Sequence, residues 1–452
     1  MQLHPGTPQQ SRCTELNMNI TQLPPNDEIW YTSSDGKIVM PTHNSVFGVE
    51  IVSNTYNNGK GVIKFNGEVT EIGKQAFYHC DACTRQLFMI SAIAAGDKTP
   101  SWMHIAISSS NITSITLPQS VTKIGEQAFS DCHDLISVTI PDSVTEICGR
   151  AFYHCKGLLG INIPNSVTTI GDSAFFGCIS LSNITIPNSV TEIGTSFFGC
   201  IGLKEFKGKF ASEDGRYLII DGKIIAIAPA GLTEYIIPDS VIEIGDRAFS
   251  HSNLISVTIP NSVTKIGFAA FMSCSDLTSV SIPNSVTQIN KSAFCGCQKL
   301  ESIYIPDSVI EIGEQAFSSC KSLTSINIPN SVTSIGNFAF SGCCNLMCVD
   351  IPSSITEING TFKDCTSLTN VSIPNSVTKI GDRTFAQCSN LTSVNIPDGV
   401  TMIDSLAFWD CSKLTTINIP SSVKKIDKEA FKGCKNLPFK TKLKILKIRM
   451  GF

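Results

Sequence analysis

A dipeptide of isoleucine or leucine followed by proline recurs along this chain at an almost constant interval. Most successive prolines in the series are 23 residues apart, two intervals are 22 residues, and one is 51 residues. The prolines are Pro118, Pro141, Pro164, Pro187, Pro238, Pro260, Pro283, Pro306, Pro329, Pro352, Pro374, Pro397 and Pro420. A fixed period of this size is typical of a solenoid, in which each repeat forms one coil that packs on its neighbours.

Each repeat follows the pattern L-x-x-V/I-x-I-P-x-S-V-T-x-I-G-x-x-A-F-x-x-C. The part before proline, "LTSVSIP" at 277–283, alternates apolar and polar residues as a half-buried strand does. Proline ends that strand because it has no N–H to donate to a neighbouring strand. The part after it, "SVTQI" at 285–289, predicts a second short extended segment on the opposite side of the coil.

The position after this second segment is usually glycine, as at Gly267 and Gly381, and is Asn or Asp in several repeats. These residue types tolerate left-handed backbone and cap helices. We therefore expect the chain to turn there and A-F-x-x-C to form about one helical turn with Phe and Cys facing inward. Cys148 is the exception at this position, and the pattern does not explain it.

The cysteines recur at one position of the repeat and should form a column inside the stack. The column contains Cys132, Cys155, Cys178, Cys200, Cys274, Cys297, Cys320, Cys343, Cys365, Cys388, Cys411 and Cys434. We interpret them as buried free thiols that serve as small hydrophobic residues. Disulfides between neighbouring coils are the alternative, and these would need the same strained geometry at every step.

The 23-residue unit with its S-V-T-x-I-G-x-x-A-F-x-x-C core resembles the BspA-like leucine-rich repeat family, over roughly 63–437. The segments "NDEIWYTSSDGKIV" and "ASEDGRYLIIDGKIIAIAPAGLTEY" resemble sequences that flank or interrupt such arrays. The resemblance implies an α/β repeat solenoid, curved as a right-handed superhelix, with a parallel β-sheet on its concave face. It also implies adhesion and protein binding at a cell surface or after secretion, without catalysis.

The expected organisation follows the breaks in the repeat. In chain order we expect a disordered lead at 1–26, an N-terminal β cap at 27–66, repeats at 67–203 with a degenerate coil at 81–110, a β-hairpin island at 204–234, repeats at 235–437 and a basic C-terminal cap or tail at 438–452. A turn is expected at Asn57–Gly61, and the island hairpin should turn at Asp221-Gly222. The basic, alternating tail predicts a last strand whose edge is protected by lysines, with a membrane-surface anchor as the alternative.

Composition and motifs argue against several classes of function. A net charge of −4 and a pI near 6.0 give no electrostatic footprint for nucleic acid. No run of 18 apolar residues predicts a transmembrane helix, and the N-terminus does not read as a secretory signal peptide. The C-x-x-C at Cys80–Cys83 lacks the second pair that zinc requires. No nucleotide-binding or nucleophile motif is in its required context, so we expect no cofactor, no metal and no catalytic residue.

The remaining candidate for function is the polar surface of the strand before proline. The solvent-facing position next to the Ile-Pro pair is occupied by Thr139, Asn162, Thr185, Thr258, Ser281, Tyr304, Asn327, Asp350, Ser372, Asn395 and Asn418. A second row, two residues earlier, contains Ser137, Gly160, Asn183, Ser256, Ser279, Ser302, Ser325, Cys348, Asn370, Ser393 and Thr416. Tyr304 is the one aromatic residue of the first set and Asp350 its one charge, so a binding focus is expected near them.

From these features we expect a non-catalytic, protein-binding or adhesive solenoid whose partners are proteins, possibly host or matrix proteins. A structural spacer is one alternative, and it predicts a neighbouring domain, which this chain does not show. A glycan-binding module is another, and it would need aromatic platforms, whereas Tyr304 is almost alone.

Overall fold

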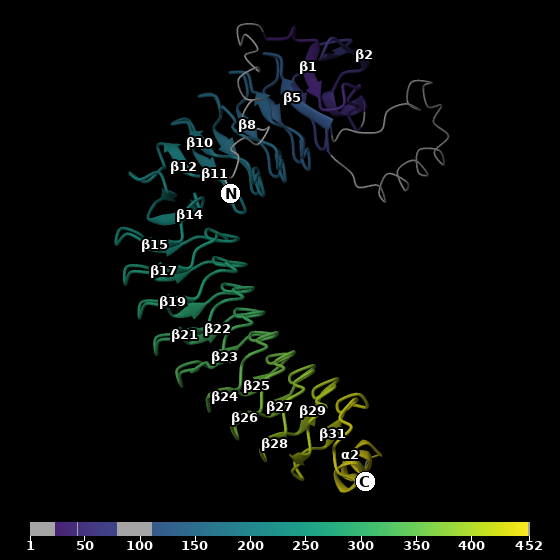
Figure 1. The fold of residues 1–452 in the computed structure, drawn as a ribbon, viewed down its shortest axis with the longest axis vertical. Coiled ribbons are helices and arrows are strands. Elements are labelled where there is room, and N and C mark those ends of the chain that lie inside the picture. Colours follow the sequence, from purple (N-terminus) through teal and green to yellow (C-terminus); the bar gives the residue numbers. More distant parts are fainter. Residues whose placement is uncertain (1–22, 43, 79–110, 451–452) are drawn as a thin grey trace, which may run out of the picture. The chain divides into compact units, whose positions relative to one another are not determined.

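The structure, a computed structural model, describes residues 23–42, 44–78 and 111–450 (Figure 1). The chain forms two compact units. The first unit is Met1–Ala174 with Pro187–Ile193, and the second is Phe175–Ile186 with Gly194–Phe452. The predicted disordered lead at 1–26 falls almost wholly outside the described residues.

One short strand precedes the proline of most coils, and neighbouring strands pair in parallel to form what we call the first ladder. In the first unit the ladder contains β5 (Ile112–Thr116) and β7 (Ser137–Thr139). In the second unit it contains β10 (Asn183–Ile186), β12 (Glu205–Gly208), β15 (Glu234–Ile236), β17 (Ser256–Thr258), β19 (Ser279–Ser281), β21 (Ser302–Tyr304), β24 (Cys348–Asp350), β26 (Asn370–Ser372), β28 (Ser393–Asn395) and β30 (Thr416–Asn418). The central residue of each three-residue strand is buried and its two neighbours point outward in nearly every case.

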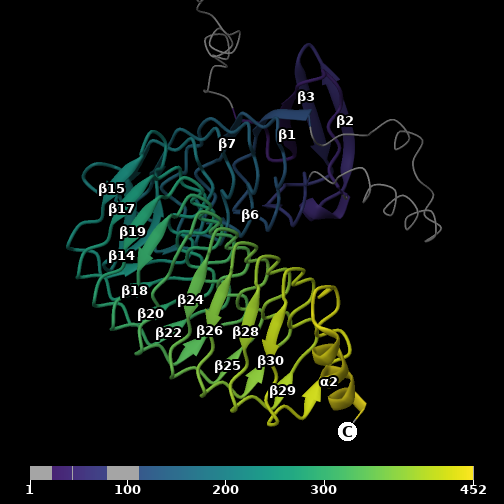
Figure 2. The ribbon, with the colours of Figure 1, turned by 60° about the horizontal axis from the view of Figure 1, so that its bottom comes forward.

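A second strand, mostly two residues long, precedes the glycine position, and these strands form the second ladder (Figure 2). In the first unit it contains β4 (Glu71–Ile72), β6 (Lys123–Ile124), β8 (Glu146–Ile147), β9 (Thr169–Ile170) and β11 (Glu192–Ile193). In the second unit it contains β14 (Lys223–Ile227), β16 (Glu243–Ile244), β18 (Lys265–Ile266), β20 (Gln288–Ile289), β22 (Glu311–Ile312), β23 (Ser334–Ile335), β25 (Glu357–Ile358), β27 (Lys379–Ile380), β29 (Met402–Ile403) and β31 (Lys425–Ile426). The predicted solenoid with two short parallel strands in each coil is confirmed. Its curvature and concave side stay predictions of the family resemblance.

The segment A-F-x-x-C does not form the predicted helical turn. It makes consecutive tight turns in which the residue before Ala and the residue before Cys have left-handed backbone, as at Gln315 (φ 56°) and Ser319 (φ 61°). The amide of Gln315 donates to the carbonyl of Asn337, and the amide of Phe317 to that of Ala339, both in the next coil. These amides bond between coils, so they cannot form the i to i−4 bonds of a helix.

Where glycine stands before this segment, it is explained by close packing and not by left-handed backbone, which corrects the sequence-based interpretation. Gly267, Gly313 and Gly336 do not have positive φ angles. A Cβ atom on Gly336 would lie 2.3 Å from the backbone nitrogen of Glu314 in the preceding coil. Glycine thus lets two successive coils approach each other at this corner.

Phenylalanine rings form the centre of the core. Phe271, Phe294, Phe317 and Phe340 stack in order, with successive ring centroids 5.3 to 5.5 Å apart and ring planes within 2° of parallel. All four side chains are fully buried. The predicted inward column is therefore confirmed, and each ring is packed between copies of itself.

Three side chains of the repeat donate hydrogen bonds to backbone carbonyls of the preceding coil. Ser308 Oγ donates to the Val286 carbonyl at 2.7 Å, and Thr333 Oγ1 donates to the Ile310 carbonyl at 3.2 Å. Cys320 Sγ donates to the Phe294 carbonyl at 3.3 Å, and most of the other column cysteines make the equivalent bond. All cysteines within the described residues are free, which confirms the thiol column.

The N-terminal strands form an antiparallel sheet that joins the first ladder. They are β1 (Glu28–Ser33), β2 (Ile51–Asn57) and β3 (Lys60–Phe65), with a short 3-10 helix η1 (Asn44–Phe47) between the first two. Strand β1 pairs with β3 on one side and with β5 on the other. The β2–β3 turn at Asn58-Gly59 lies inside the predicted Asn57–Gly61 segment, and both residues have left-handed backbone.

The degenerate coil expected at 81–110 lies wholly outside the described residues. On either side of it, β4 pairs directly with β6, and the rings of Phe77 and Phe129 stack at 5.3 Å. The described coils that contain β4 and β6 are therefore direct neighbours in the second ladder.

The island hairpin forms as predicted but is not inserted between coils. Strand β13 (Tyr217–Ile220) pairs with β14 in antiparallel fashion around Asp221-Gly222. Strand β14 also pairs in parallel with β16, and the preceding strand β12 pairs with β10. Residues 204–234 therefore supply strands to both ladders.

The basic tail is a helix, not the predicted strand. Helix α2 spans Phe439–Met450 and follows Pro438 directly. Its alternating lysines suggested a strand, but Lys, Leu, Met and Arg are also strong helix formers. The burial of Ile445 and the partial burial of Ile448 against the last coil favour the helix.

Candidate protein-binding face

The eleven sequence-predicted positions next to the Ile-Pro pair form what we call the outer row. All are exposed except Thr139, which is half-buried. They point outward because side chains alternate across a strand, and the Val or Ile between the two polar rows is buried. Thr139 and Asn162 belong to the first unit and the other nine to the second.

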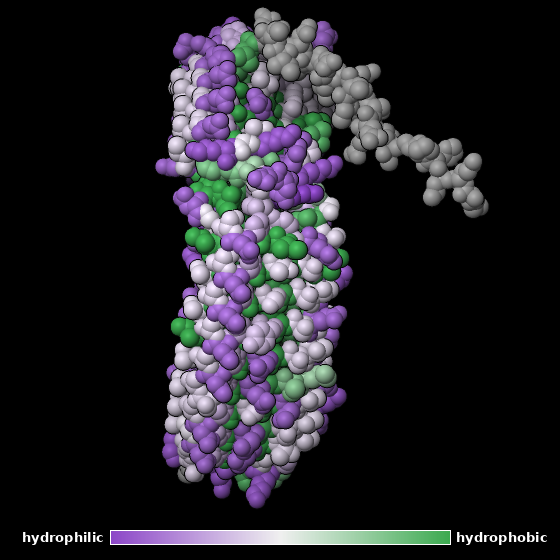
Figure 3. All heavy atoms as spheres, turned by 90° about the vertical axis from the view of Figure 1, so that its left-hand side faces the viewer, coloured by the Kyte–Doolittle hydropathy of each residue, from purple (hydrophilic) through white to green (hydrophobic). Residues whose placement is uncertain are grey.

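Strand pairing places the members of the outer row in register within the second unit. Thr258 is opposite Ser281, and Ser281 is opposite Tyr304. Asn418 Nδ2 donates to Asn395 Oδ1 at 3.2 Å, so two amides of the row also bond to each other. The second predicted row is exposed as well, apart from Gly160 and Ser256, which are half-buried. Figure 3 shows columns of hydrophilic and near-neutral residues on one face, with narrower lines of hydrophobic residues between them.

The predicted focus around Tyr304 and Asp350 is an exposed surface with two further features. Tyr304 is 60% exposed, and Asp350 lies two coils further along the same row. Met347, 54% exposed, and the exposed Cys348 lie just before Asp350. Sequence reasoning missed Met347, although the repeat carries Thr or Glu at that position in most coils and a methionine there is unusual.

The outer row also contains an apolar residue, between Thr185 and Thr258, that the sequence analysis left out. Ile236 in β15 pairs in register with Thr258 and is 75% exposed. It stands directly before Ile237 and Pro238, in the same position as Thr258 before its own Ile-Pro pair. Applying the repeat pattern across the island would have found it.

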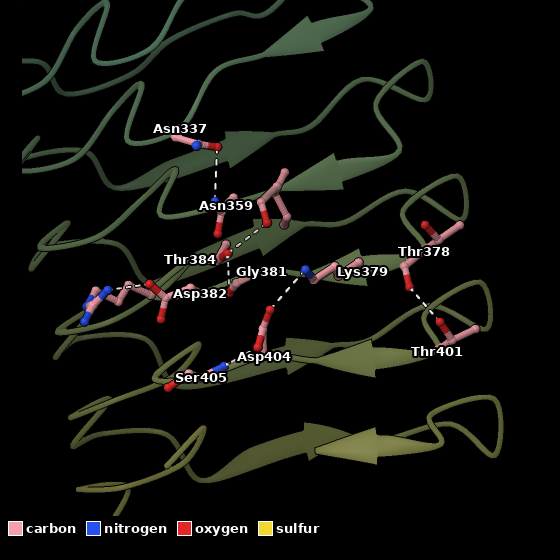
Figure 4. Close-up of polar contacts among 12 residues, drawn as sticks. Asn337, Asn359, Thr378, Lys379, Gly381, Asp382, Thr384, Thr401, Asp404 and Ser405 are labelled. Atoms are coloured by element: carbon pink, nitrogen blue, oxygen red, sulfur yellow. Dashed lines mark hydrogen bonds and ion pairs between the residues drawn. The ribbon is translucent and has the colours of Figure 1, made fainter. Parts of the chain in front are cut away.

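A groove of about 290 Å³ opens on the other side of the second unit, along the second ladder (Figure 4). Its lining includes Asn337, Glu357, Asn359 and Lys379. The coil there is one residue shorter than usual, so Asn359 occupies the glycine position and left-handed Gly360 follows it directly.

The polar groups of this groove are largely bonded within the protein. Asn359 Nδ2 donates to Asn337 Oδ1 at 3.1 Å, and Lys379 Nζ lies 3.0 Å from Asp404 Oδ2. Burial acts to raise the pKa of Asp404, but hydrogen bonds from Lys379 and the Ser405 amide outweigh it and lower this pKa below its usual value. Asp404 is thus ionised at neutral pH and neutralises Lys379. The lining residues contain no histidine or cysteine that could serve as a base or nucleophile.

A groove of about 570 Å³ in the first unit contains Cys148, the exception at the glycine position. Its thiol donates to Glu146 Oε1 at 3.1 Å, and the other oxygen of that carboxylate pairs with Lys123 Nζ at 3.0 Å. Burial, followed by the hydrogen bond and negative charge of Glu146, raises the pKa of Cys148 to about 12. The thiol is therefore protonated at neutral pH and is a poor nucleophile.

Residues 23–42, 44–78 and 111–450 contain no group of three or more His, Cys, Asp or Glu side chains placed to hold a metal ion. In the same ranges no helix has the length and apolar character needed to cross a bilayer.

The repeats of this chain are similar to those of a known family. The family model described as "BspA type Leucine rich repeat region" matches residues 105–212, 229–324 and 310–438. A leucine-rich repeat protein from Bacteroides ovatus is 29% identical, with 72% of this chain and 88% of that chain covered and a TM-score of 0.45. A leucine rich cell surface protein from Faecalibacterium prausnitzii is 28% identical, with 72% and 83% covered and a TM-score of 0.40. A leucine-rich repeat protein from Eubacterium ventriosum is 24% identical, with 72% and 77% covered and a TM-score of 0.42. Among curated proteins there is no significant match.

Proposed function

The chain belongs to the family of BspA-type leucine-rich repeat proteins, and from this premise we propose that it is a non-catalytic scaffold that binds other proteins through the outer row. Repeat solenoids of this kind generally serve as binding scaffolds with extended surfaces. Adhesion at a cell surface, the role that the family resemblance implies, is part of the proposal.

One observation carries the proposal: the outer row is in register, exposed and composed of side chains that the fold does not need. In the second unit Thr258, Ser281 and Tyr304 align across paired strands, and their side chains point away from the core. Polar, weakly charged residues on a rigid sheet favour an extended contact with a protein. Tyr304 and Met347 supply large exposed side chains of types that are enriched in protein interfaces.

A photo-crosslinking experiment tests which face binds. A photoreactive amino acid is placed at Asn327, in the outer row, or at Ser334, which is also exposed but lies on the second ladder. Each variant is presented to a panel of purified extracellular matrix proteins. We expect crosslinks from position 327 and none from 334. Equal crosslinking from both positions would contradict the assignment of the outer row.

The island is tested by substitution and not by deletion. Because β12 and β14 belong to the two ladders, removing 204–234 would disrupt the stack itself. Exchanging the exposed Glu213 for serine or for lysine changes the island surface and leaves both strands in place. If these exchanges abolish crosslinking at 327, the island contributes to the same interface.

A further inference from the structure

Helix α2 is apolar on two opposite faces. On one face, Ile445 is 4% exposed and Ile448 packs against the same core. Arg449 Nη2 donates to the Asp427 carbonyl at 2.7 Å, and Lys442 Nζ donates to the Lys435 carbonyl at 3.0 Å. This face fixes the helix on the last coil of the second unit.

The opposite face carries what we call the outer stripe: Phe439, Leu443, Leu446 and Met450. These residues are spaced by four, three and four positions, so they lie on one line along the helix. Their exposed fractions run from 41% to 80%. At 100° per residue the stripe lies roughly opposite Ile445 and Ile448, so one helix cannot bury both faces in the same core.

Positive charge lies along both sides of the outer stripe. Helical spacing puts Lys440, Lys444 and Lys447 on one flank. Lys442 and Arg449 lie on the other flank, at the border of the inner face, and both stay exposed although each donates one bond to the last coil. The helix contains no acidic residue. Residues 424–452 hold ten basic and two acidic side chains, whereas the whole chain has 34 basic and 38 acidic. The end of the chain is thus basic on a protein that is acidic overall.

We propose that α2 binds the surface of a membrane that contains anionic phospholipid. The outer stripe enters the boundary between headgroups and acyl chains, and the flanking cations contact lipid phosphates and carboxylates. Phe and Leu on one face with Lys and Arg at its borders is the pattern of helices that lie in the membrane interface. The inner face keeps the helix folded on the solenoid before it meets the membrane, so binding does not require ordering the segment.

A flat anionic surface fits this face better than an acidic protein does. The stripe is a narrow ridge with cations on both flanks, so a planar array of negative headgroups satisfies both flanks while the ridge enters it. A protein partner would need an apolar groove with acidic residues along both walls. The proposal is independent of the outer row and holds whether or not that row binds a protein.

Vesicle co-sedimentation tests the proposal with the full chain. Vesicles are made of phosphatidylcholine alone or of phosphatidylcholine with phosphatidylserine. We expect the protein to pellet with the second kind and to remain in solution with the first, and added salt should release it. Neutralising each lysine near an anionic surface should weaken binding about fivefold, so the triple variant Lys440→Gln, Lys444→Gln and Lys447→Gln should bind about a hundredfold more weakly.

Matched variants separate this site from general effects. The control for the charge variant is Lys299→Gln, Lys321→Gln and Lys413→Gln, which removes three exposed lysines elsewhere in the second unit. The stripe variant is Leu443→Ser with Leu446→Ser, and its control is Ile242→Ser with Ile310→Ser, two exposed isoleucines far from α2 in sequence. We expect at least a tenfold loss of vesicle binding for the stripe variant and none for the controls, with unchanged thermal unfolding because Ile445 still holds the helix.

A fluorescent residue reports insertion directly. In Leu446→Trp the new indole should shift to shorter emission wavelengths with phosphatidylserine vesicles and be quenched by brominated lipid. Equal pelleting with both kinds of vesicle, no pelleting with either, or equal losses in the charge variant and its control would each overturn the proposal. If the protein bound polyglutamate but not vesicles, the ligand of α2 would be an acidic protein and not a membrane, and the proposal would be wrong.

Discussion

The phenylalanine column and the outer row are built by the same repeats, yet they differ in how much sequence variation they contain. In the second unit nine successive coils from Phe249 to Phe431 place phenylalanine in the stack. Over the same coils the outer row contains Thr, Ser, Tyr, Asn and Asp. Each ring must fit between two others about 5 to 6 Å away, whereas the outer side chains face solvent. A few inward positions therefore specify the stack, and the outward positions are free to specify a partner.

Truncating one ring should have the largest effect. Phe317→Ala removes a fully buried ring between two stacked neighbours and should lower the free energy of unfolding by about 3–5 kcal/mol. Urea unfolding followed by circular dichroism measures this change. An unchanged unfolding midpoint would show that the stack does not depend on this ring, and packing would then not explain why the column varies less in sequence than the outer row.

The second largest loss of stability is expected where glycine lets two successive coils approach each other. Gly336→Ala places a Cβ atom 2.3 Å from a backbone nitrogen and should cost about 1–3 kcal/mol, as overpacking does. Gly160→Ala is the matched change, because a Cβ atom there meets nothing within 4 Å. We expect its effect to stay within about 0.5 kcal/mol. If both variants unfold alike in urea, close packing is not the reason for glycine at this position.

Alkaline pH should reduce the contribution of the thiol column to the free energy of unfolding, whereas the outer row contains no such buried thiol. Burial raises the pKa of Cys320 and Cys388 above the ordinary value of 9.0 that applies in the unfolded chain. Their contribution is therefore complete below pH 9 and declines as pH rises above it, by about 1.4 kcal/mol per pH unit for each thiol that ionises only on unfolding.

Urea unfolding at several pH values above 9 measures this decline. Cys320→Ala should reduce the slope of unfolding free energy against pH by one thiol's share. If the slope in this variant equals that of the wild type, Cys320 does not remain protonated in the folded chain.

The smallest effect on stability should come from the outer row. Tyr304→Ala removes a side chain that is 60% exposed and should change unfolding free energy by less than about 0.5 kcal/mol. Binding to a partner found by crosslinking should nevertheless fall about tenfold, as expected for an aromatic contact residue. The control for binding is Ile310→Ala, which removes an exposed side chain directly before β22 of the second ladder. A Tyr304→Ala variant that unfolds easily would contradict its outward placement.

The period made the stack predictable, because inward residues recur with it and apolar columns follow from that recurrence. The phenylalanine and cysteine columns could therefore be derived from spacing alone. The turn around Ala316 and Phe317 could not, because its amides bond to the next coil, and bonds between coils leave no signal within one repeat. The same is true of the thiols: Cys320 reads as a small apolar residue, but its sulfur also bonds a carbonyl of the coil before it.

The two ends of the array were harder to predict than its middle. Lysine and apolar residues alternate in 440–448 as in an edge strand, and only the packing of Ile445 on the last coil distinguishes a helix. For the candidate site, the exposure of the outer row could be predicted because side chains alternate across a strand. The repeat pattern points to polar positions in unbroken repeats, so it did not predict Met347, which is apolar, or Ile236, which follows the island.

The bonds made by the serine and threonine of S-V-T and by the column cysteines have a direction, since the donor lies in the later coil and the acceptor in the earlier one, as at Ser308, Thr333 and Cys320. A ribosome releases the earlier coil first. Every new coil that leaves the exit tunnel then finds carbonyl acceptors already fixed in place, beginning from the antiparallel sheet of β1 and β3. Synthesis can thus lay down this protein one layer at a time, with each finished layer serving as the template for the next.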